Sequence, residues 1–383
     1  MENRTPMKLI HLANIHSTNI GNGALISGLE STMQEDFPSP ISWIREPWDD
    51  YTFGLRDFDS EFVKKVNASD GLIVGGAVTF NGRDYNNRTG SRFELPLELW
   101  SEIKKPIVFY GLSYRHWPGQ PYHHLDRLKL MIEKILSSDN MCLAVRNDGT
   151  KDWLNNLTKI DCEQIPEIPD SAVFVQHLDR YCPEILEGVR NIVLSFNDED
   201  ACYRFDQESN HKSRMHVINA LASVVERLSE EYPVNFVLCP HYFDDYRMMS
   251  DFLEKVRPRL AHQQMVSTGL YKIKDTNLFY GRYKQADLSI SMRVHSMSPC
   301  IGLGTPMVAY TTQDRMNVFM SKIGLTGHVV DAFDSEAAEY LLTKAKYALE
   351  NSSEIKRQFN AVRESLRRDT RMFHDRIYDL LTS

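Results

Sequence analysis

Arg293 and His295 lie two residues apart in the stretch LSISMRVHSMSPCIGLGTPMVAY (residues 288–310), which starts and ends like a buried strand. A charged arginine is costly to bury unless an anion meets it. Arg293 therefore either pairs with a structural carboxylate or binds an anionic ligand at the mouth of a cleft. His295 is suited to acid or base chemistry beside that anion, because its unperturbed pKa lies near neutrality.

Two more arginines follow strand-like runs. Arg146 closes the run MCLAVR, and Arg315 comes shortly after the run PMVAY. Several cations at strand ends around one cleft suit a ligand that carries both a carboxylate and a phosphate. The residues after Arg146 (RNDGT) have the composition of a helix cap, so a capped helix with a surface arginine is the structural alternative there.

Glycines follow two other strand-like runs. Gly21 and Gly23 stand in NIGNGA, between a strand-like run and a helix-like one, and Gly75 and Gly76 follow the run GLIV. Glycine at such positions lets backbone amides approach a ligand, or it allows a helix to pack closely. The sequence leaves both interpretations open for each pair.

The elements that must position these residues alternate between apolar strand-like runs and amphipathic helix-like runs. This alternation predicts parallel sheets covered on both faces, in which ligands bind beyond the carboxyl ends of the strands. A proline-containing segment, residues 163–191, interrupts the pattern. We therefore predict an α/β fold of two doubly wound, Rossmann-like domains with a cleft between them: residues 1–183, residues 184–350, and a C-terminal helix, 351–383, that packs back on the first domain.

Bulk composition excludes several classes of protein. The chain has 383 residues and a formal net charge of −8, which argues against a general nucleic-acid binder. Its six cysteines are scattered singly, which predicts free thiols in a reducing cytoplasm. The N-terminus has no apolar signal region, and we predict a cytoplasmic location. The basic residues Arg368, Arg371 and Arg376 form either a solvated helix face or a contact with the inner face of a membrane.

Taken in order along the chain, these stretches resemble the motifs of the polysaccharide pyruvyl transferase family. The resemblance spans roughly residues 8–330 and is most specific over residues 288–325. The matching stretches are NIGNGA, Gly75-Gly76-Ala77, Arg146-Asn147-Asp148-Gly149-Thr150, Pro169-Asp170, SMRVHS and Arg315 with Phe319 and Gly324-Leu325. Asn22, Ala77, Asn147 and Arg315 replace the residues that are usual in the family.

The resemblance implies an arrangement like that of GT-B glycosyltransferases, with an acceptor side on the first domain and a donor side on the second. It implies a pyruvate ketal built on a sugar of a cell-surface polysaccharide or its precursor, with phosphoenolpyruvate as donor. The acceptor sugar would be lipid-linked, nucleotide-linked or polymeric. This chemistry requires no metal, and we predict no metal site and no cofactor.

The resemblance also implies roles for individual residues. Arg146, Arg293 and Arg315 would bind the donor's carboxylate and phosphate, and His295 would be the general acid or base. Asp148 or Asp170 would orient His295 or act as the base. An ordinary core histidine is the alternative for His295.

The loop SYRHWPGQPYHHLD (residues 113–126) is the further acceptor candidate. Its aromatic rings could stack on sugars and its histidines could bind hydroxyl groups, although a surface loop or a histidine-rich metal site would have the same composition. The predicted acceptor-binding residues are Asn19, Gly21, Asn22, Gly75, Gly76, His116, Trp117 and His123.

Two rival functions use the same fold. A GT-B glycosyltransferase would hold the diphosphate of a nucleotide-sugar with the MRVHS stretch and Arg315. A binding protein without catalytic activity is the third interpretation, and the substitutions at Asn22 and Asn147 motivate it. Retention of Arg146, Arg293 and His295 together argues against it.

Overall fold

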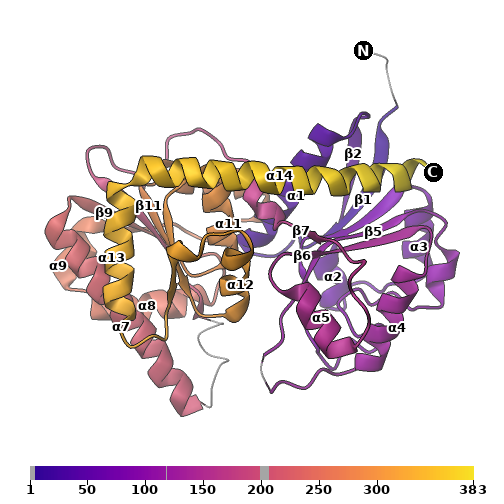
Figure 1. Cartoon of the computed structure of the whole chain (residues 1–383), viewed down its shortest axis with the longest axis horizontal. Coiled ribbons are helices and arrows are strands. Elements are labelled where there is room, and N and C mark those ends of the chain that lie inside the picture. The colour runs from indigo at the N-terminus through magenta and orange to yellow at the C-terminus, as the bar shows by residue number, and fades with distance from the viewer. Residues whose placement is uncertain (1–4, 118, 199–206) are drawn as a thin grey trace. The chain divides into compact units, whose positions relative to one another are not determined.

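The chain folds into two compact units, each built on one parallel β-sheet (Figure 1). The computed structural model describes residues 5–117, 119–198 and 207–383, with the backbone alone for residues 207–212. Unit 1 comprises Met1–Ser17, Gly28–Ser171 and Ser365–Ser383. Unit 2 comprises Thr18–Ser27 and Ala172–Glu364.

The sheet of unit 1 has the strand order β2-β1-β3-β5-β6-β7, and β4 pairs with β5 off this path. All of these pairings are parallel. Every residue of β3 and β6 is buried, as expected for parallel strands with both faces covered. The strands are β1 (Met7–Ala13), β2 (Ile41–Pro47), β3 (Gly71–Gly75), β4 (Val78–Phe80), β5 (Ile107–Tyr114), β6 (Met141–Arg146) and β7 (Glu167–Ile168).

Helices cover both faces of this sheet and enclose two apolar cores. One core gathers aromatic side chains such as Trp48, Phe93 and Phe109, and the other includes Tyr110 and Ile377. The helices of this part of the chain are α1 (Ile20–Asp36), α2 (Trp48–Thr52), α3 (Ser60–Asn67), η1 (Leu99–Glu102), α4 (Leu125–Leu136) and α5 (Thr150–Thr158).

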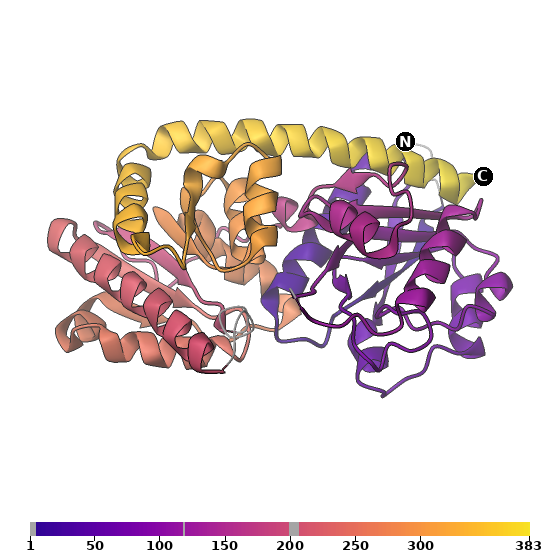
Figure 2. The same ribbon diagram turned by 60° about the horizontal axis from the view of Figure 1, so that its bottom comes forward.

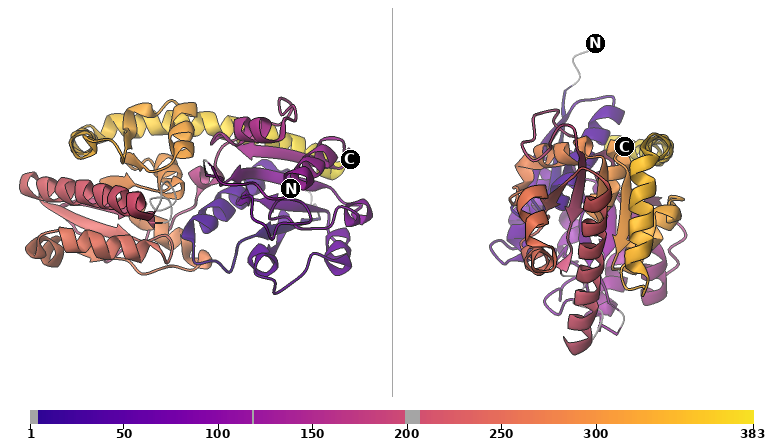
Figure 3. Two further views of the ribbon diagram at one scale, coloured as in Figure 1. Left: turned by 90° about the horizontal axis from the view of Figure 1, so that it is seen from below. Right: turned by 90° about the vertical axis from the view of Figure 1, so that its left-hand side faces the viewer.

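The sheet of unit 2 has the strand order β10-β9-β8-β11-β12-β13, again with parallel pairings throughout. Figure 2 and the left view of Figure 3 show helices on both faces of it. Helices α7, α8 and α13 pack side by side, and α10 packs against α11. The strands are β8 (Arg190–Ser195), β9 (Val234–Cys239), β10 (Met265–Ser267), β11 (Leu288–Ser291), β12 (Met307–Thr311) and β13 (Val329–Asp331).

The helices of this second part follow the predicted alternation with the strands. They are η2 (Ser171–Phe174), α7 (Gln207–Glu231), α8 (Asp245–Lys255), α9 (Pro258–Gln264), η3 (Ile273–Asp275), α10 (Thr276–Gln285), α11 (Val294–Leu303), α12 (Asp314–Lys322), η4 (Thr326–His328), α13 (Ala337–Glu350) and α14 (Ser352–Thr382). The predicted C-terminal helix, 351–383, corresponds to α14, and Asn351 separates it from α13.

The C-terminal part of α14 belongs to unit 1, where Asp36 holds it. His374 is buried, with its Nδ1 2.7 Å from Asp36 Oδ2 and its Nε2 2.9 Å from the hydroxyl of Tyr110. Arg367 donates to both carboxylate oxygens of Asp36, at 2.7 and 2.8 Å. Burial raises the pKa of Asp36, but hydrogen bonds from His374 and Arg367 outweigh burial and hold it well below its usual range.

The two compact units divide the chain at residues other than those of the predicted ranges. The units change over between Ser171 and Ala172, and the segment Thr18–Ser27 belongs to unit 2. The backbone N–H of Ile20 donates to the carbonyl of His241 at 3.1 Å, which ties that segment to the second sheet. A local hydrophobic pattern cannot indicate a contact between residues so far apart in sequence.

Five cysteines, Cys142, Cys162, Cys182, Cys239 and Cys300, are buried and unpaired, and Cys202 lies outside the described residues. Burial raises the pKa of the Cys142, Cys239 and Cys300 thiols to about 12. Among the helices of the described residues, none has both the length and the apolar run needed to cross a membrane.

Candidate functional site

Arg293 lies at the carboxyl edge of the unit 2 sheet, between β11 and α11. It is the N-cap residue of α11 and has an extended backbone conformation. The hydroxyl of Ser296 accepts the backbone N–H of Arg293 at 3.3 Å and donates to its carbonyl at 2.8 Å. This reciprocal capping fixes where the strand ends and the helix begins.

The guanidinium of Arg293 meets a carboxylate within the protein. Its Nε donates to the carbonyl of Phe196 at 2.8 Å and to Asp245 Oδ2 at 3.2 Å, and its Nη2 donates to Asp245 Oδ1. The side chain of Asp245 is fully buried, while that of Arg293 is 12% exposed. Of the two roles left open by the sequence, the structural ion pair is therefore present, and the Arg293 side chain as a whole is partly exposed.

Asp245 lies in the first turn of α8 and is held by the backbone before it. Its Oδ2 accepts the backbone N–H of His241 at 2.8 Å and that of Tyr242 at 3.0 Å. Burial raises the pKa of Asp245, and the Arg293 charge and these hydrogen bonds only partly offset that rise. Asp245 thus links the loop after β9 to the residue that ends β11.

His241 is buried beneath this ion pair. Its Nε2 lies 2.7 Å from the hydroxyl of Tyr283, and Phe279 packs edge-on against its ring. Burial holds the pKa of His241 well below 6.5, and the charges of Arg293 and His295 lower it further. His241 is therefore neutral at pH 7, and its Nδ1 has no hydrogen-bond partner among the described residues.

His295 is the second residue of α11 and packs against the start of α1. Its carbonyl accepts the hydroxyl of Tyr280 at 2.7 Å. A Cβ at Gly21 would lie 2.5 Å from His295 Nδ1, so only glycine fits there. The glycine turn of NIGNGA therefore serves close packing against the candidate catalytic histidine.

The remaining predicted residues of that turn shape the start of α1. The side-chain oxygen of Asn19 accepts the backbone N–H of Gly21 at 3.1 Å, and the carbonyl of Asn19 accepts that of Asn22 at 3.0 Å. Asn19, Gly21 and Asn22, predicted for the acceptor side on the first domain, thus lie in unit 2 beside His295.

Arg315 occupies the first turn of α12, after the neighbouring strand β12. Its Nε donates to the side-chain oxygen of Gln313 at 2.8 Å. Three buried polar atoms nearby have no hydrogen-bond partner among the described residues: Thr312 Oγ1, Gln313 Nε2 and Asn317 Oδ1. Because buried polar atoms are nearly always hydrogen-bonded, this end of β12 has the capacity to bind a polar ligand.

In unit 1, Arg146 and Asp170 form a buried ion pair. Arg146 ends β6, and its Nη1 lies 3.1 Å from Asp170 Oδ2 after β7. Asp148 is also buried and accepts the hydroxyls of Ser113 and Thr150. The helix cap expected from these residue types is absent from this segment, because the N-cap of α5 is Gly149, with a left-handed backbone and no capping side chain.

Gly75 is the last residue of β3 and Gly76 follows it, and the sequence left open whether these glycines serve ligand approach or close packing. A Cβ at Gly75 would lie 3.1 Å from His11 Nε2, so this glycine serves close packing. Gly76 has a φ of +68°, a conformation that favours glycine. His11 Nδ1 in turn lies 2.9 Å from Glu30, a buried pair that the sequence analysis did not identify.

In the loop of residues 113–126, the first histidine, His116, is hydrogen-bonded within the protein. His116 Nε2 lies 2.7 Å from the carbonyl of Gln120, and its Nδ1 accepts the indole N–H of Trp153 at 3.4 Å. Trp117 is half-buried and His123 is exposed. Among the described residues, no three or more histidine, cysteine or acidic side chains are grouped so that they could hold a metal ion.

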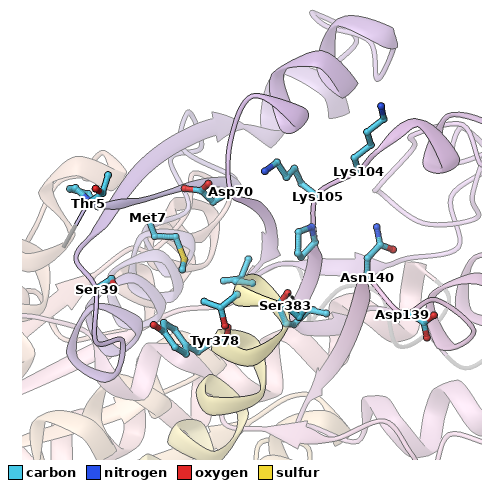
Figure 4. A pocket seen from close by; sticks show the side chains of 15 residues that line it. Thr5, Met7, Ser39, Asp70, Lys104, Lys105, Asp139, Asn140, Tyr378 and Ser383 are labelled. Atoms are coloured by element: carbon cyan, nitrogen blue, oxygen red, sulfur yellow. Dashed lines mark hydrogen bonds between the residues drawn. The ribbon is translucent and has the colours of Figure 1, made fainter.

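A pocket lies away from all of these residues, at the opposite edge of the unit 1 sheet. It has a volume of about 560 Å³ and is lined by Asp70, Lys104 and Asn140, next to the amino ends of β3, β5 and β6, and by Tyr378 of α14. Figure 4 shows these side chains around the opening. Because ligands of parallel α/β sheets bind at the carboxyl edge, we do not assign the reaction to this pocket.

Asp245 and His241 are the functional candidates that sequence reasoning missed. They occur in the stretch VNFVLCPHYFDD, directly after a strand that was correctly predicted. The polar residues that follow the carboxyl end of this strand were the available signal, but the partner of Asp245 is Arg293, 48 residues later.

Comparison with known proteins agrees with this structure. Residues 19–314 match the family model of polysaccharide pyruvyl transferases. The chain therefore belongs to the polysaccharide pyruvyl transferase family and is a transferase, as the sequence motifs predicted. A comparison with curated proteins found no match.

Solved structures show the fold. A glycosyltransferase from Rickettsia africae is 12% identical with a TM-score of 0.53, and the match covers 99% of this chain and 100% of that one. A protein from Listeria monocytogenes assigned as a UDP-N-acetylglucosamine 2-epimerase is 12% identical with a TM-score of 0.50, and covers 93% of this chain and 91% of that one. The predicted fold class, two parallel-sheet α/β domains as in GT-B glycosyltransferases, is confirmed.

Proposed function

We propose that this enzyme transfers the pyruvyl group of phosphoenolpyruvate to two hydroxyls of a sugar, forming a ketal on a cell-surface polysaccharide or its precursor. The observation that carries the proposal is the placement of Arg293 and His295. Both lie inside the segment matched to the family, at the carboxyl edge of a parallel sheet and the N-terminus of α11. That end of a helix favours anions.

The reaction balances without a cofactor. A proton adds to the methylene carbon of phosphoenolpyruvate, and a sugar hydroxyl attacks the central carbon as it becomes positive. Phosphate then leaves, and the second hydroxyl closes the ketal ring. The two hydroxyls lose two protons, of which one ends on the new methyl group and the other on phosphate. The enzyme must therefore supply cations for the anionic donor and a group that moves protons.

Unit 2 residues have the chemistry for the donor. Arg293, held in one orientation by Asp245, would bind the donor's carboxylate or phosphate. Arg315 would assist as phosphate departs, beside the buried polar atoms at the end of β12. His295 would move the protons. His241 is buried and neutral, so it adds no charge that would compete with this role.

The site residues predicted in unit 1 keep their proposed roles, except that Asp170 is no longer a candidate base. Arg146 is predicted to bind the donor, but its buried pair with Asp170 makes Asp170 a positioning residue in our proposal. Asp148 remains the proposed base of this unit. The proposed acceptor-side residues of this unit remain Gly75, Gly76, His116, Trp117 and His123. Gly75 would act indirectly, through its close packing against His11.

The reaction is proposed to occur in the cytoplasm, where phosphoenolpyruvate is available. The acceptor would then be a lipid-linked, nucleotide-linked or polymeric glycan on that side of the membrane. Contact with the membrane surface is a secondary proposal, and Arg371 of the basic helix face already donates to Asp36 at 3.1 Å.

Transfer of the labelled carbon tests the proposal. Purified enzyme is incubated with phosphoenolpyruvate labelled with ¹³C at C2 and with panels of nucleotide-linked, lipid-linked and polymeric glycans. We expect a ketal carbon signal and one released phosphate for each ketal formed, both absent with His295→Gln. Release of a nucleotide from a nucleotide-sugar with no consumption of phosphoenolpyruvate would favour the rival glycosyltransferase function instead.

A further inference from the structure

A second pocket in unit 1 lies at the same edge of the sheet as Gly75 and Arg146. Its volume is about 300 Å³, and its walls come from α2 with the residues after it and from the loop of residues 81–95. These segments follow β2 and β4, so the pocket lies beyond the carboxyl ends of two strands. We propose that it binds one sugar ring of the acceptor and recognises a carboxylate or phosphate on that ring, an inference that rests on the proposed function.

Aromatic rings form part of the pocket wall and rim. Tyr51 and Phe58 are stacked with ring centroids 4.1 Å apart, and both line the pocket. Tyr85 lines it from the opposite segment and is 56% exposed. An exposed aromatic ring beside a pocket of this size offers the apolar face on which a sugar ring stacks.

The polar lining suits hydroxyl groups. Asn86, Asn87 and Arg88 follow Tyr85 in the pocket wall. Glu94, also in the wall, accepts the backbone N–H groups of Arg88 and Thr89 at 2.9 and 3.0 Å, so its carboxylate is already stabilised by the loop. Side-chain amides and a guanidinium at fixed positions provide the hydrogen bonds that would orient a sugar.

Arg92 gives the pocket its selectivity for charge. Among the described residues, its guanidinium donates to uncharged oxygens only, those of Val78, Asn14 and Thr52, and it lies 5.3 Å from the Trp48 ring centroid. Its Nε is buried with no hydrogen-bond partner among the described residues. Arg92 is half-buried, and an anionic ligand would compensate a cation that has no carboxylate in contact among the described residues.

The carboxylates of Asp49, Asp50 and Glu46 have hydrogen-bond or ion-pair partners other than Arg92. Asp49 is near enough to stabilise the charge of Arg92, but its Oδ2 accepts the backbone N–H of His16 at 2.9 Å, and no ion pair with Arg92 forms in the described residues. Asp50 and Glu46 pair with Arg56 at 3.2 and 2.9 Å. Arg92 therefore contributes a positive charge to a pocket wall in which Asp57 is exposed and the Glu94 carboxylate is hydrogen-bonded to the loop backbone.

The loop of residues 113–126, which was predicted to bind the acceptor, is hydrogen-bonded to one wall of this pocket. The backbone N–H of His123 donates to the carbonyl of Gly82 at 3.2 Å, and the Tyr122 hydroxyl donates to that of Gly90 at 2.7 Å. His124 Nε2 lies 2.7 Å from the carbonyl of Asp84. The segment of residues 82–90, which carries Tyr85 and Asn86, is thus held at several points.

Direct sugar binding without any donor tests the inference. Methyl β-glucuronide, glucose 1-phosphate and methyl β-glucoside are titrated into the full chain by calorimetry, with saturation-transfer NMR to detect weak binding. At least one anionic sugar should bind about tenfold more tightly than the neutral glucoside, as expected when a charge-assisted hydrogen bond is added. The two anionic arms distinguish a carboxylate from a phosphate.

Three variants make the test specific. Arg92→Gln should abolish the preference for anionic sugars, and its thermal unfolding shows whether it remains folded. Tyr85→Ala, at an exposed position, should weaken all three sugars about fivefold or more through loss of stacking. Tyr181→Ala removes a tyrosine that is 83% exposed in unit 2 and should change nothing.

Equal affinity for neutral and anionic sugars, an unchanged preference in folded Arg92→Gln, or no binding at all would overturn the inference. Its failure is separate from failure of the proposed function, because no donor is present. If the protein binds an anionic sugar but does not bind phosphoenolpyruvate, the inference about the pocket is supported and the proposed donor is refuted.

Discussion

Asp245 holds Arg293 at the end of β11 through two oxygens, one of which also accepts the backbone N–H groups of His241 and Tyr242. The loop after β9 and the strand end at β11 are therefore joined by one buried carboxylate. Because the guanidinium is planar, this contact fixes the direction in which its remaining N–H groups point. Arg293 is thus oriented before any ligand arrives.

Asp245→Asn tests this orientation. The amide keeps the size of the side chain but replaces one acceptor oxygen with a donor that faces the guanidinium. We expect KM for phosphoenolpyruvate to rise about tenfold or more, with a loss of stability of about 3 kcal/mol because a buried partner charge is left unpaired. Steady-state kinetics and urea unfolding measure the two effects.

Asp251→Asn is the matched control for that variant. Asp251 lies on the same helix and pairs with Arg214, away from Arg293. It should change the stability slightly and KM not at all. Equal effects of the two substitutions on KM would contradict a specific positioning role for Asp245.

Gly21→Ala tests the packing of α1 against His295. Alanine normally stabilises a helix relative to glycine, but here its methyl group would collide with His295 Nδ1. We expect kcat to fall about 100-fold because displacing a catalytic group by about 1 Å has effects of that size. Gly269→Ala, where an added Cβ meets nothing within 4 Å, should leave kcat unchanged. An active Gly21→Ala enzyme would show that His295 does not need this position.

His295→Gln separates donor binding from proton transfer. Glutamine retains hydrogen-bonding capacity but cannot exchange a proton near neutral pH. We predict that kcat falls about 100-fold to 10,000-fold while phosphoenolpyruvate still binds, measured by calorimetry. Loss of binding with kcat per bound donor unchanged would reassign His295 to the donor-binding residues.

Acid should weaken unit 1 through His374. Burial lowers the pKa of His374 below its usual value of 6.5, although Asp36 opposes that shift. The unfolded chain then binds a proton that the folded chain resists, so the stabilising contribution is present above about pH 6.5 and declines as pH falls. Urea unfolding between about pH 8 and about pH 5.5 should show this decline. The free energy of unfolding should depend less steeply on pH in His374→Gln than in wild type. An unchanged pH dependence would exclude His374 as its source.

Local patterns predicted the strands and helices around the site well, because apolar periodicity and strand ends are local properties. The run LSIS became β11, and Arg293 lies between this strand and the next helix, where it is the N-cap residue. Arg146, Arg293 and Arg315 lie at or shortly after strand ends, as predicted, and their binding of the donor stays a prediction. Parallel sheets concentrate such residues at one edge, so sequence order alone was informative.

The long-range contacts of the candidate site could not be predicted from the sequence. Asp245 carries no local signal that it meets Arg293, and the N-terminal Gly21 does not indicate that it packs on His295, 274 residues away. The same limitation placed Asn19 and Asn22 in the first domain. Long-range contacts depend on the complete fold, which periodicity does not specify.

Thermal unfolding in the presence of phosphoenolpyruvate tests the central claim most directly. Wild type, Arg293→Ala and the surface control Arg247→Ala are heated with phosphoenolpyruvate and, in parallel, with UDP- and CMP-sugars. The account predicts that phosphoenolpyruvate raises the unfolding temperature of the wild type and the control, and that this rise is lost in Arg293→Ala. Stabilisation by a nucleotide-sugar alone, with no response to phosphoenolpyruvate, would contradict it.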